Sequence, residues 1–297
     1  MNWQEGAQMK VDNAIIMAAG TASRFAPLSY EKPKALIEVR GEVLIERQIR
    51  QLRDAGIEEI VVVTGYKAEQ FEYLRDKYGV VLVHNPDYLT RNNHASIHVA
   101  REYLKNSYIC SSDNYFLSNP FESEVDESYY AAVYMEGETE EWCITEEDGW
   151  IEDVEVGGHD SWVMQGHVFW SESFSRSFIH ILEEEYDLPE TADQLWEAIY
   201  IEHIHELPMK IRKYPAAFIF EFDTLDELRC FDASYINDTR SAILKRAAAE
   251  LSVEEKEIRS VKSFKNENNA AAGFTFETGE SKYKYHYATQ RMEVVMK

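Results

Sequence analysis

A run of small residues followed by cations has the types and spacing of a phosphate-binding loop. An apolar segment, residues 15–17, leads into six small residues, and three cations follow: Ala18, Ala19, Gly20, Thr21, Ala22, Ser23, then Arg24, Lys32 and Lys34. Small side chains let backbone amides approach an anion, and the cations place positive charge beside it. The combination predicts binding of a nucleoside triphosphate.

Two common phosphate loops do not fit this segment. The P-loop pattern G-x-x-x-x-G-K-[ST] does not occur in the chain. The dinucleotide pattern G-x-G-x-x-G fails because Ala22 and Pro27 stand where it needs glycine or open spacing. The segment therefore indicates another kind of nucleotide site.

Two aspartates have the setting of magnesium ligands. Asp113 follows an apolar strand that includes residues 108–110, and Asp223 ends the segment 220–223. Thr224 and Glu227 have capping-box spacing, which leaves the Asp223 carboxylate available. Magnesium prefers hard oxygen ligands and needs only one or two carboxylates when it bridges phosphates. We therefore expect Mg²⁺ as cofactor, while Glu221 is open between a metal or acceptor contact and an exposed strand position.

Aromatic residues with acidic neighbours could bind a cationic acceptor. Trp142 follows Glu140 and Glu141, and Trp196 lies three residues after Asp193. A quaternary ammonium group cannot donate a hydrogen bond, so it is bound by aromatic faces with a carboxylate nearby. Both tryptophans are candidate acceptor-binding residues, with a place in the hydrophobic core as the alternative for each.

The loop resembles the signature of the sugar-phosphate and choline-phosphate nucleotidyltransferases, A-A-G-x-G-[ST]-R-x-x-P-L followed by P-K-x-L. The resemblance covers about residues 13–235. Within this family, the chain resembles the bacterial CTP:phosphocholine cytidylyltransferases. One position departs from the signature, because Ala22 replaces its second glycine.

The resemblance assigns roles to individual residues. It implies that Arg24 contacts the β- and γ-phosphates, that Lys34 contacts the α-phosphate or the incoming phosphate, and that Asp113 binds metal. It also implies a pocket role for Trp142. Asn93 and Ser96 would contact the pyrimidine, with plain helix capping as the alternative.

Alternating strand and helix patterns over residues 14–113 predict an α/β fold with a doubly wound, mostly parallel mixed sheet, as in Rossmann-like and GT-A-like proteins. Ligands of such sheets bind beyond the carboxyl ends of the strands, where Gly20 and Asp113 would lie. We expect an N-terminal extension (1–12), a nucleotidyltransferase domain (13–235) and an appendage (236–297) of one helix and a β-hairpin around Thr278 and Gly279.

Composition limits the choice of partners. The net charge of −24 disfavours nucleic acid, no apolar run is long enough to span a membrane, and the three cysteines are scattered. We expect a cytoplasmic protein, with a homodimer left open.

The sequence thus predicts a magnesium-dependent enzyme that transfers CMP from CTP to phosphocholine. Four other acceptors stay open: aminoethylphosphonate, glycerol phosphate, inositol phosphate and sugar 1-phosphate. A non-catalytic nucleotide-binding regulator is the alternative from another class.

Overall fold

The computed structural model describes residues 8–267 and 271–296, and the chain forms two compact units. Unit 1 contains the described residues up to Gly20 together with Ile45–Phe220, and unit 2 contains Thr21–Leu44 and the described residues from Glu221 onward. These borders differ from the predicted ones, because the cation-bearing half of the signature segment joins the C-terminal part of the chain.

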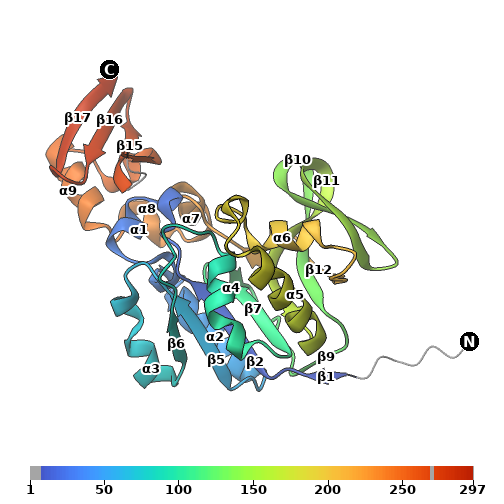
Figure 1. Ribbon diagram of the computed structural model, residues 1–297. Helices are drawn as coiled ribbons and strands as arrows, with labels where there is room; N and C mark the ends of the chain where they lie inside the picture. Colours follow the sequence, from blue (N-terminus) through green and yellow to red (C-terminus); the bar gives the residue numbers. More distant parts are fainter. Residues whose placement is uncertain (1–7, 268–270, 297) are drawn as a thin grey trace, which may run out of the picture. The chain divides into compact units, whose positions relative to one another are not determined.

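A seven-stranded mixed sheet forms the centre of unit 1 (Figure 1). Its strands in spatial order are β10 (Tyr129–Glu147), β12 (Lys210–Tyr214), β11 (Trp150–Trp170), β7 (Ser107–Ser111), β2 (Asn13–Ala18), β5 (Glu59–Thr64) and β6 (Val81–His84). The neighbours β7, β2, β5 and β6 run parallel, whereas β11 is antiparallel to β7. This architecture confirms the predicted fold class.

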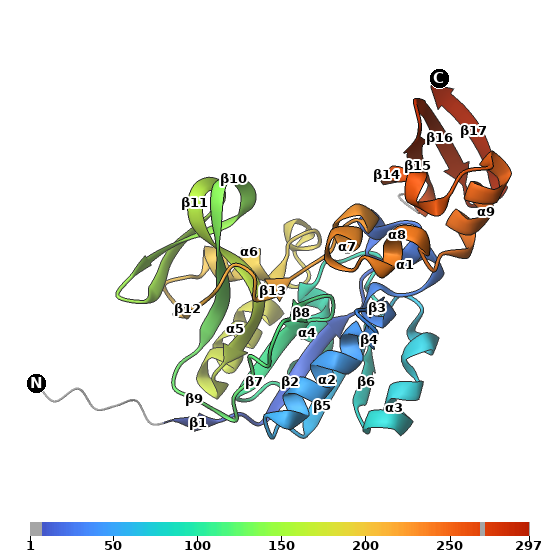
Figure 2. The ribbon, with the colours of Figure 1, turned by 180° about the vertical axis from the view of Figure 1, so that it is seen from behind.

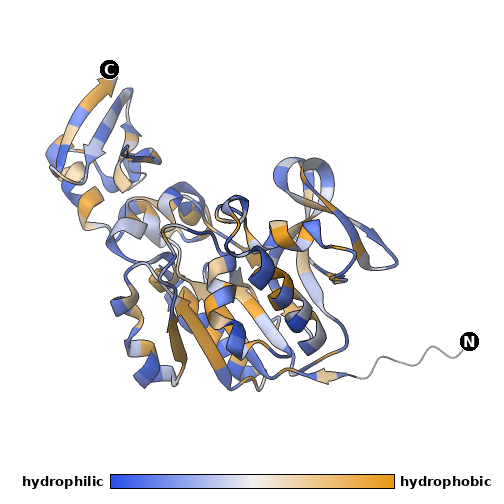
Figure 3. Ribbon diagram, in the orientation of Figure 1, coloured by the Kyte–Doolittle hydropathy of each residue, from blue (hydrophilic) through white to orange (hydrophobic). Residues whose placement is uncertain are grey.

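Helices cover both faces of this sheet. Helices α4 (His94–Ala100) and α5 (Glu172–Glu185) lie on one face (Figure 1), and α2 (Leu44–Asp54) lies on the other (Figure 2). The central strands β2 and β5 are apolar on both faces (Figure 3), with Ile15, Ile16, Val61 and Val62 fully buried. A strand covered on both sides has this continuous apolar pattern.

The remaining elements of unit 1 are short. Two small strand pairs form, β1 (Met9–Lys10) with β9 (Glu124–Val125) and β8 (Tyr115–Phe116) with β13 (Ile219–Phe220). The helical segments are η3 (Ala68–Phe71), α3 (Tyr73–Tyr78), η4 (Arg101–Tyr103), η5 (Pro189–Thr191) and α6 (Trp196–Glu202).

Unit 2 begins with the short elements that carry the predicted cations. These are η1 (Ser23–Phe25), α1 (Leu28–Glu31), η2 (Lys34–Leu36) and the strand pair β3 (Glu38–Val39) and β4 (Glu42–Val43). After residue 221 follow α7 (Leu225–Phe231), α8 (Ser234–Asn237), α9 (Ala242–Leu251) and η6 (Glu255–Glu257).

A four-stranded antiparallel sheet completes unit 2. Its strands are β14 (Arg259–Lys265), β15 (Ala271–Thr278), β16 (Ser281–His286) and β17 (Arg291–Met296), in that order. The predicted hairpin is present as β15 and β16, and β14 and β17 extend it on both sides into a four-stranded sheet. Within the described residues, no helix is both long and apolar enough to cross a membrane.

Candidate active site

In unit 2, the two predicted catalytic cations, Arg24 and Lys34, form ion pairs with the predicted carboxylates. Arg24 Nη1 is 2.7 Å from Asp223 Oδ2. Lys34 Nζ is 3.4 Å from Asp223 Oδ1 and 3.8 Å from Glu221 Oε1. The structure therefore brings together four of the residues that sequence reasoning had selected, from segments about 190 positions apart.

The two cations differ in their surroundings. The Lys34 side chain is 7% exposed, and its ammonium group lies 5.8 Å from the centre of the Phe25 ring. The Arg24 side chain is 75% exposed. Lys34 is thus fixed by packing, whereas the arginine reaches solvent and can meet a ligand at the surface of unit 2.

The turn before Arg24 requires an unusual backbone conformation at Ala22. This residue has φ 45° and ψ 48°, in the left-handed region. Glycine adopts that region without steric cost, whereas a β-carbon crowds the following carbonyl oxygen. The geometry gives a physical reason for the glycine in the signature and shows that alanine accommodates the same turn.

The backbone around Asp223 confirms the predicted capping box. Thr224 Oγ1 accepts a hydrogen bond from Glu227 N at 3.2 Å, and Glu227 Oε2 accepts from the backbone N–H groups of Thr224 and Asp223. Glu227 and Thr224 therefore satisfy the start of α7. The Asp223 carboxylate faces the cations instead.

In unit 1, Asp113 lies just beyond the carboxyl end of β7, next to the carboxyl end of β2, where the small-residue loop begins. Strands β2 and β7 are parallel neighbours with Met17 opposite Ser111, and Ser112 N donates to Met17 O at 3.2 Å. Ala19 O accepts a hydrogen bond from Tyr66 N at 3.0 Å. The carboxyl ends of neighbouring strands thus carry the loop and the half-buried Asp113, as expected for this fold.

Gln48 is a residue of this edge that sequence reasoning missed. Its Nε2 donates to Ser111 O and to Asn114 O, both at 2.8 Å, so it fastens the turn on both sides of Asp113. The side chain is 1% exposed. A signal was available, because Gln48 lies four residues from both Leu44 and Leu52 on the apolar stripe of α2.

Asn93 and Ser96 have structural partners in unit 1. Asn93 Oδ1 accepts from Trp196 N at 2.7 Å, and Asn93 Nδ2 donates to Glu197 Oε2 at 3.0 Å. Ser96 is 3% exposed and accepts from Asn85 Nδ2 at 3.2 Å. Asn93 makes no side-chain capping bond and instead joins the starts of α4 and α6. Contact of either residue with a nucleotide base stays a prediction.

Glu197 is the second residue that the sequence did not reveal. It is half-buried, and burial raises the pKa of its carboxyl group to about 7, although hydrogen bonds from Asn93 and Tyr130 act in the opposite direction. Tyr130 Oη donates to Glu197 Oε1 at 3.3 Å. Its sequence signal was an acidic residue inside the otherwise apolar start of α6.

The two candidate acceptor tryptophans lie in different environments. Trp196 is 2% exposed, and its ring packs against Trp170 at 5.1 Å and Tyr130 at 5.7 Å between ring centres. This placement favours the hydrophobic-core alternative for Trp196, since the surrounding rings cover it. Trp142 is half-buried on β10, beside the exposed Glu141.

Each of the two candidate metal ligands, taken by itself, has donor atoms that suit magnesium better than a transition metal. Asp113 and Asp223 offer hard carboxylate oxygens. Across residues 8–267 and 271–296, no group of three or more His, Cys, Asp and Glu side chains is arranged to enclose a metal ion.

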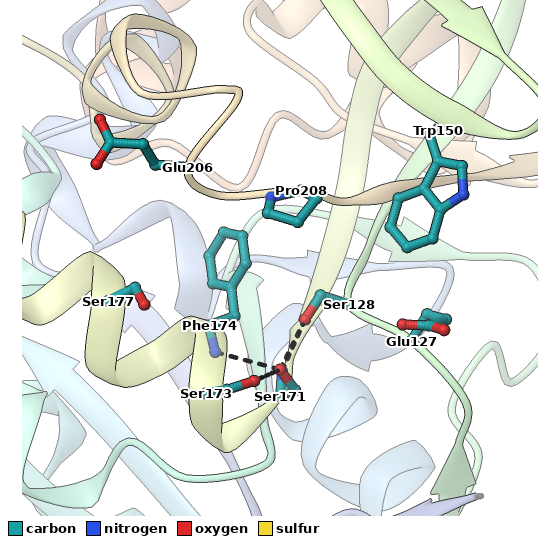
Figure 4. A pocket seen from close by; sticks show the side chains of 9 residues that line it. All are labelled: Glu127, Ser128, Trp150, Ser171, Ser173, Phe174, Ser177, Glu206 and Pro208. Atoms are coloured by element: carbon teal, nitrogen blue, oxygen red, sulfur yellow. Dashed lines mark hydrogen bonds between the residues drawn. The ribbon is translucent and has the colours of Figure 1, made fainter. Parts of the chain in front are cut away.

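A pocket at the start of α5 in unit 1 is lined by several serines (Figure 4). Their hydroxyl groups bond to one another and to the helix. Ser128 Oγ donates to Ser171 Oγ at 3.1 Å, and Ser171 Oγ accepts from Phe174 N at 3.2 Å. These bonds cap α5 and explain Ser128 and Ser171, and none of the serines belongs to the predicted site.

Parallel neighbouring strands that carry a small-residue loop and a carboxylate at their carboxyl ends are typical of nucleotide-binding proteins, and comparisons with known proteins define this chain further. Residues 14–138 match the MobA-like NTP transferase domain. The choline-phosphate cytidylyltransferase of Streptococcus pneumoniae is 35% identical over 73% of this chain and 95% of its own length. The 2-aminoethylphosphonate cytidylyltransferase of Lancefieldella rimae is 36% identical over 80% of this chain and 98% of its own length.

A solved structure agrees with these relatives. The CTP:phosphocholine cytidylyltransferase structure from Streptococcus pneumoniae superposes with a TM-score of 0.73 at 34% identity, and the match covers 76% of this chain and 99% of that one. The chain belongs to the cytidylyltransferases, a family of nucleotidyltransferase enzymes.

Proposed function

We propose that this cytidylyltransferase transfers CMP from CTP to phosphocholine, which gives CDP-choline and pyrophosphate. The observation that carries the transfer chemistry is the cluster in unit 2, where the buried Lys34 ammonium and the exposed Arg24 guanidinium share Asp223. The half-buried Trp142 and its acidic neighbours support a cationic acceptor.

The proposed reaction needs no nucleophile from the protein. A phosphate oxygen of phosphocholine attacks the α-phosphorus of CTP and forms the new P–O bond. The bond from that phosphorus to the oxygen bridging to the β-phosphate breaks, and its electron pair leaves with pyrophosphate. Lys34 stabilises the charge at the α-phosphate and Arg24 the charge on the departing phosphates, as preorganised cations do in transfer reactions of this class.

Magnesium is the proposed cofactor, and its candidate ligands are Asp113 in unit 1 and Asp223 in unit 2. When bound, the ion neutralises phosphate charge and orients the phosphate oxygens. Such local positive charge is needed because the chain as a whole carries a net charge of −24.

Aminoethylphosphonate is the second candidate acceptor. The relative that bears this substrate in its name matches the chain over 98% of its own length, as fully as the choline-phosphate relative does. The two acceptors share a cationic end but differ in one property, because a primary ammonium donates hydrogen bonds and a quaternary ammonium does not. Carboxylates therefore favour aminoethylphosphonate, and aromatic faces favour phosphocholine.

A panel assay tests the proposal. The purified chain is incubated with CTP, Mg²⁺ and each of phosphocholine, aminoethylphosphonate, glycerol phosphate, inositol phosphate and a sugar 1-phosphate, and pyrophosphate is measured. We expect the highest kcat/KM with phosphocholine. Preference for aminoethylphosphonate would replace the acceptor, and no pyrophosphate with any acceptor would favour a nucleotide-binding regulator.

The same assay tests the metal. Chelation with EDTA and the substitution Asp113→Ala should each abolish pyrophosphate release, whereas Asp76→Ala, at an exposed position of α3, should leave the rate unchanged. Turnover in Asp113→Ala equal to that of the wild type would reject Asp113 as a ligand.

A further inference from the structure

This chain is longer than the solved relative, and the C-terminal sheet of unit 2 concerns this additional length. That structure is matched over 99% of its length by 76% of this chain, so about a quarter of this chain has no counterpart in it. The NTP transferase match begins at residue 14, so the preceding residues account for only a small part of the excess. We infer that most of the additional sequence is C-terminal, where β14 to β17 lie.

This sheet is anchored by its own aromatic core. Phe274 and Phe276 are fully buried, and the rings of Tyr285 and Tyr287 lie 5.1 Å and 6.0 Å from Phe274 between ring centres. Helix α9 is tied to the same sheet, because Arg246 Nη1 donates to Gln290 Oε1 at 2.9 Å. The C-terminal sheet and α9, here called the appendage, therefore pack together as one body, and its side chains can fix the position of another segment.

Three contacts join this body to residues 21–36, here called the phosphate segment. The Tyr30 ring stacks on the Tyr287 ring with 3.6 Å between centres and 5° between planes. Glu31 Oε1 accepts a hydrogen bond from Ile243 N at 3.0 Å, which satisfies a backbone donor in the first turn of α9. Strand β14 also packs against η1, the turn that carries Arg24.

The position of these contacts gives them a consequence for chemistry. Tyr30 and Glu31 belong to α1, which stands between Arg24 in η1 and Lys34 in η2. Both reaction cations are therefore attached to a short stretch whose middle is fixed to the appendage. A charge stabilises a transition state best when its position is set before the substrate arrives.

We propose that the C-terminal sheet and α9 position the phosphate segment for the triphosphate of CTP, with Tyr30 and Tyr287 as positioning residues. The kinetic part of this inference rests on the proposed function, whereas the ordering of the phosphate segment does not. Neither tyrosine touches substrate in this proposal, because each acts through the segment that carries Arg24 and Lys34.

The test compares Tyr30→Ala with two matched controls. Tyr30 is 40% exposed, so its replacement removes the stack without opening the core of the sheet. Tyr30→Phe keeps the stacked ring. Tyr283→Ala removes a tyrosine whose ring stacks on Phe276 inside the appendage, 5.3 Å between centres. Amide hydrogen exchange over residues 21–36 is measured on the ligand-free proteins, and KM for CTP and kcat are measured by pyrophosphate release.

In Tyr30→Ala we expect exchange over the phosphate segment to be about two- to tenfold faster, the size expected from loss of one aromatic pair. KM for CTP should rise by a similar factor and kcat should change less. Tyr30→Phe and Tyr283→Ala should behave as the wild type. Unchanged exchange in Tyr30→Ala, or an equal effect of Tyr283→Ala, would overturn the inference.

The outcomes also separate this inference from the proposed function. Faster exchange with an unchanged KM for CTP would overturn the link to nucleotide binding. A wild-type protein that releases no pyrophosphate with any acceptor would reject the proposed function alone, because the exchange measurement still decides whether the appendage orders residues 21–36.

Discussion

Arg24 and Asp223 form an ion pair of 2.7 Å although the arginine side chain is 75% exposed. An exposed pair contributes little to folding, because water screens the charges and two long side chains lose conformational freedom. The contact is therefore better explained by chemistry than by stability. It places the proposed phosphate-binding cation Arg24 beside a proposed metal carboxylate, and Asp223 also pairs with Lys34.

Arg24→Ala should separate stability from activity. We expect the free energy of unfolding in urea to change by less than about 1 kcal/mol, the usual limit for an exposed ion pair. KM for CTP should rise, because the β- and γ-phosphates lose their cation. Arg176→Ala, which removes another exposed ion pair, on α5, is the control and should affect neither quantity. A large loss of stability with normal kinetics would show that Arg24 is structural.

Lys34→Ala should reduce kcat much more strongly. Removal of one preorganised charge that stabilises a transition state costs about 3–4 kcal/mol, or roughly 10²- to 10³-fold in rate. Lys32 lies two residues earlier and is exposed, so Lys32→Ala is a control that changes charge by the same amount in the same segment. Pyrophosphate release measures both variants. Equal rates for the two variants would show that Lys34 does not stabilise the transition state.

Local patterns predicted the parts of the site that depend on a few neighbouring residues. The edge position of Asp113 followed from an apolar run that ends in polar residues, and the capping box of Thr224 and Glu227 followed from spacing alone. Ala22 was recognised as a departure, but the sequence could not show that it occupies the left-handed region. Such features are encoded within one element and its ends.

Contacts between distant segments could not be predicted in the same way. Asn93 bonds to Trp196 and Glu197, which follow it by more than 100 residues, so a helix cap was the nearest local explanation. Residues 129–170 form the two long strands β10 and β11, because cross-strand pairing continues through stretches without alternation. Burial of Trp196 likewise depends on which rings pack around it.

Ala22→Gly should stabilise the protein. A non-glycine residue in the left-handed region costs about 1–2 kcal/mol, and glycine removes most of that cost while adding entropy to the unfolded chain. We therefore expect a gain of about 0.5–1 kcal/mol in the free energy of unfolding. Ala249→Gly, at an exposed position in α9, should lose about 1 kcal/mol by the same measurement. A loss for both would contradict the strain at Ala22.

Glu197 should make stability depend on pH. Its pKa is about 7 in the folded protein against an ordinary value of 4.5, because burial disfavours the charged form. Between these pH values the folded state keeps a proton that the unfolded state has lost, so this group lowers stability as pH rises from about 4.5 to 7, with no further change above that range.

Glu197→Gln cannot ionise and should remove that contribution. Unfolding in urea at pH 5 and pH 8 measures it, and the wild type should lose more stability between the two values than the variant does. Glu190→Gln, at an exposed position of η5, should follow the wild type. Parallel losses in wild type and Glu197→Gln would show that the carboxyl group is already ionised at pH 5.

Trp142→Ala should weaken binding of the acceptor and leave binding of CTP unchanged. One aromatic face contributes about 0.5–2 kcal/mol to binding of a quaternary ammonium, so KM for phosphocholine should rise roughly 2- to 30-fold while KM for CTP stays constant. Trp162→Ala is the matched control, because Trp162 is also half-buried, on the strand paired with β10, and packs edge-on against Tyr134. Initial rates at varied phosphocholine and at varied CTP give both constants. An equal rise for the two variants, or a rise in KM for CTP, would move the acceptor site away from Trp142.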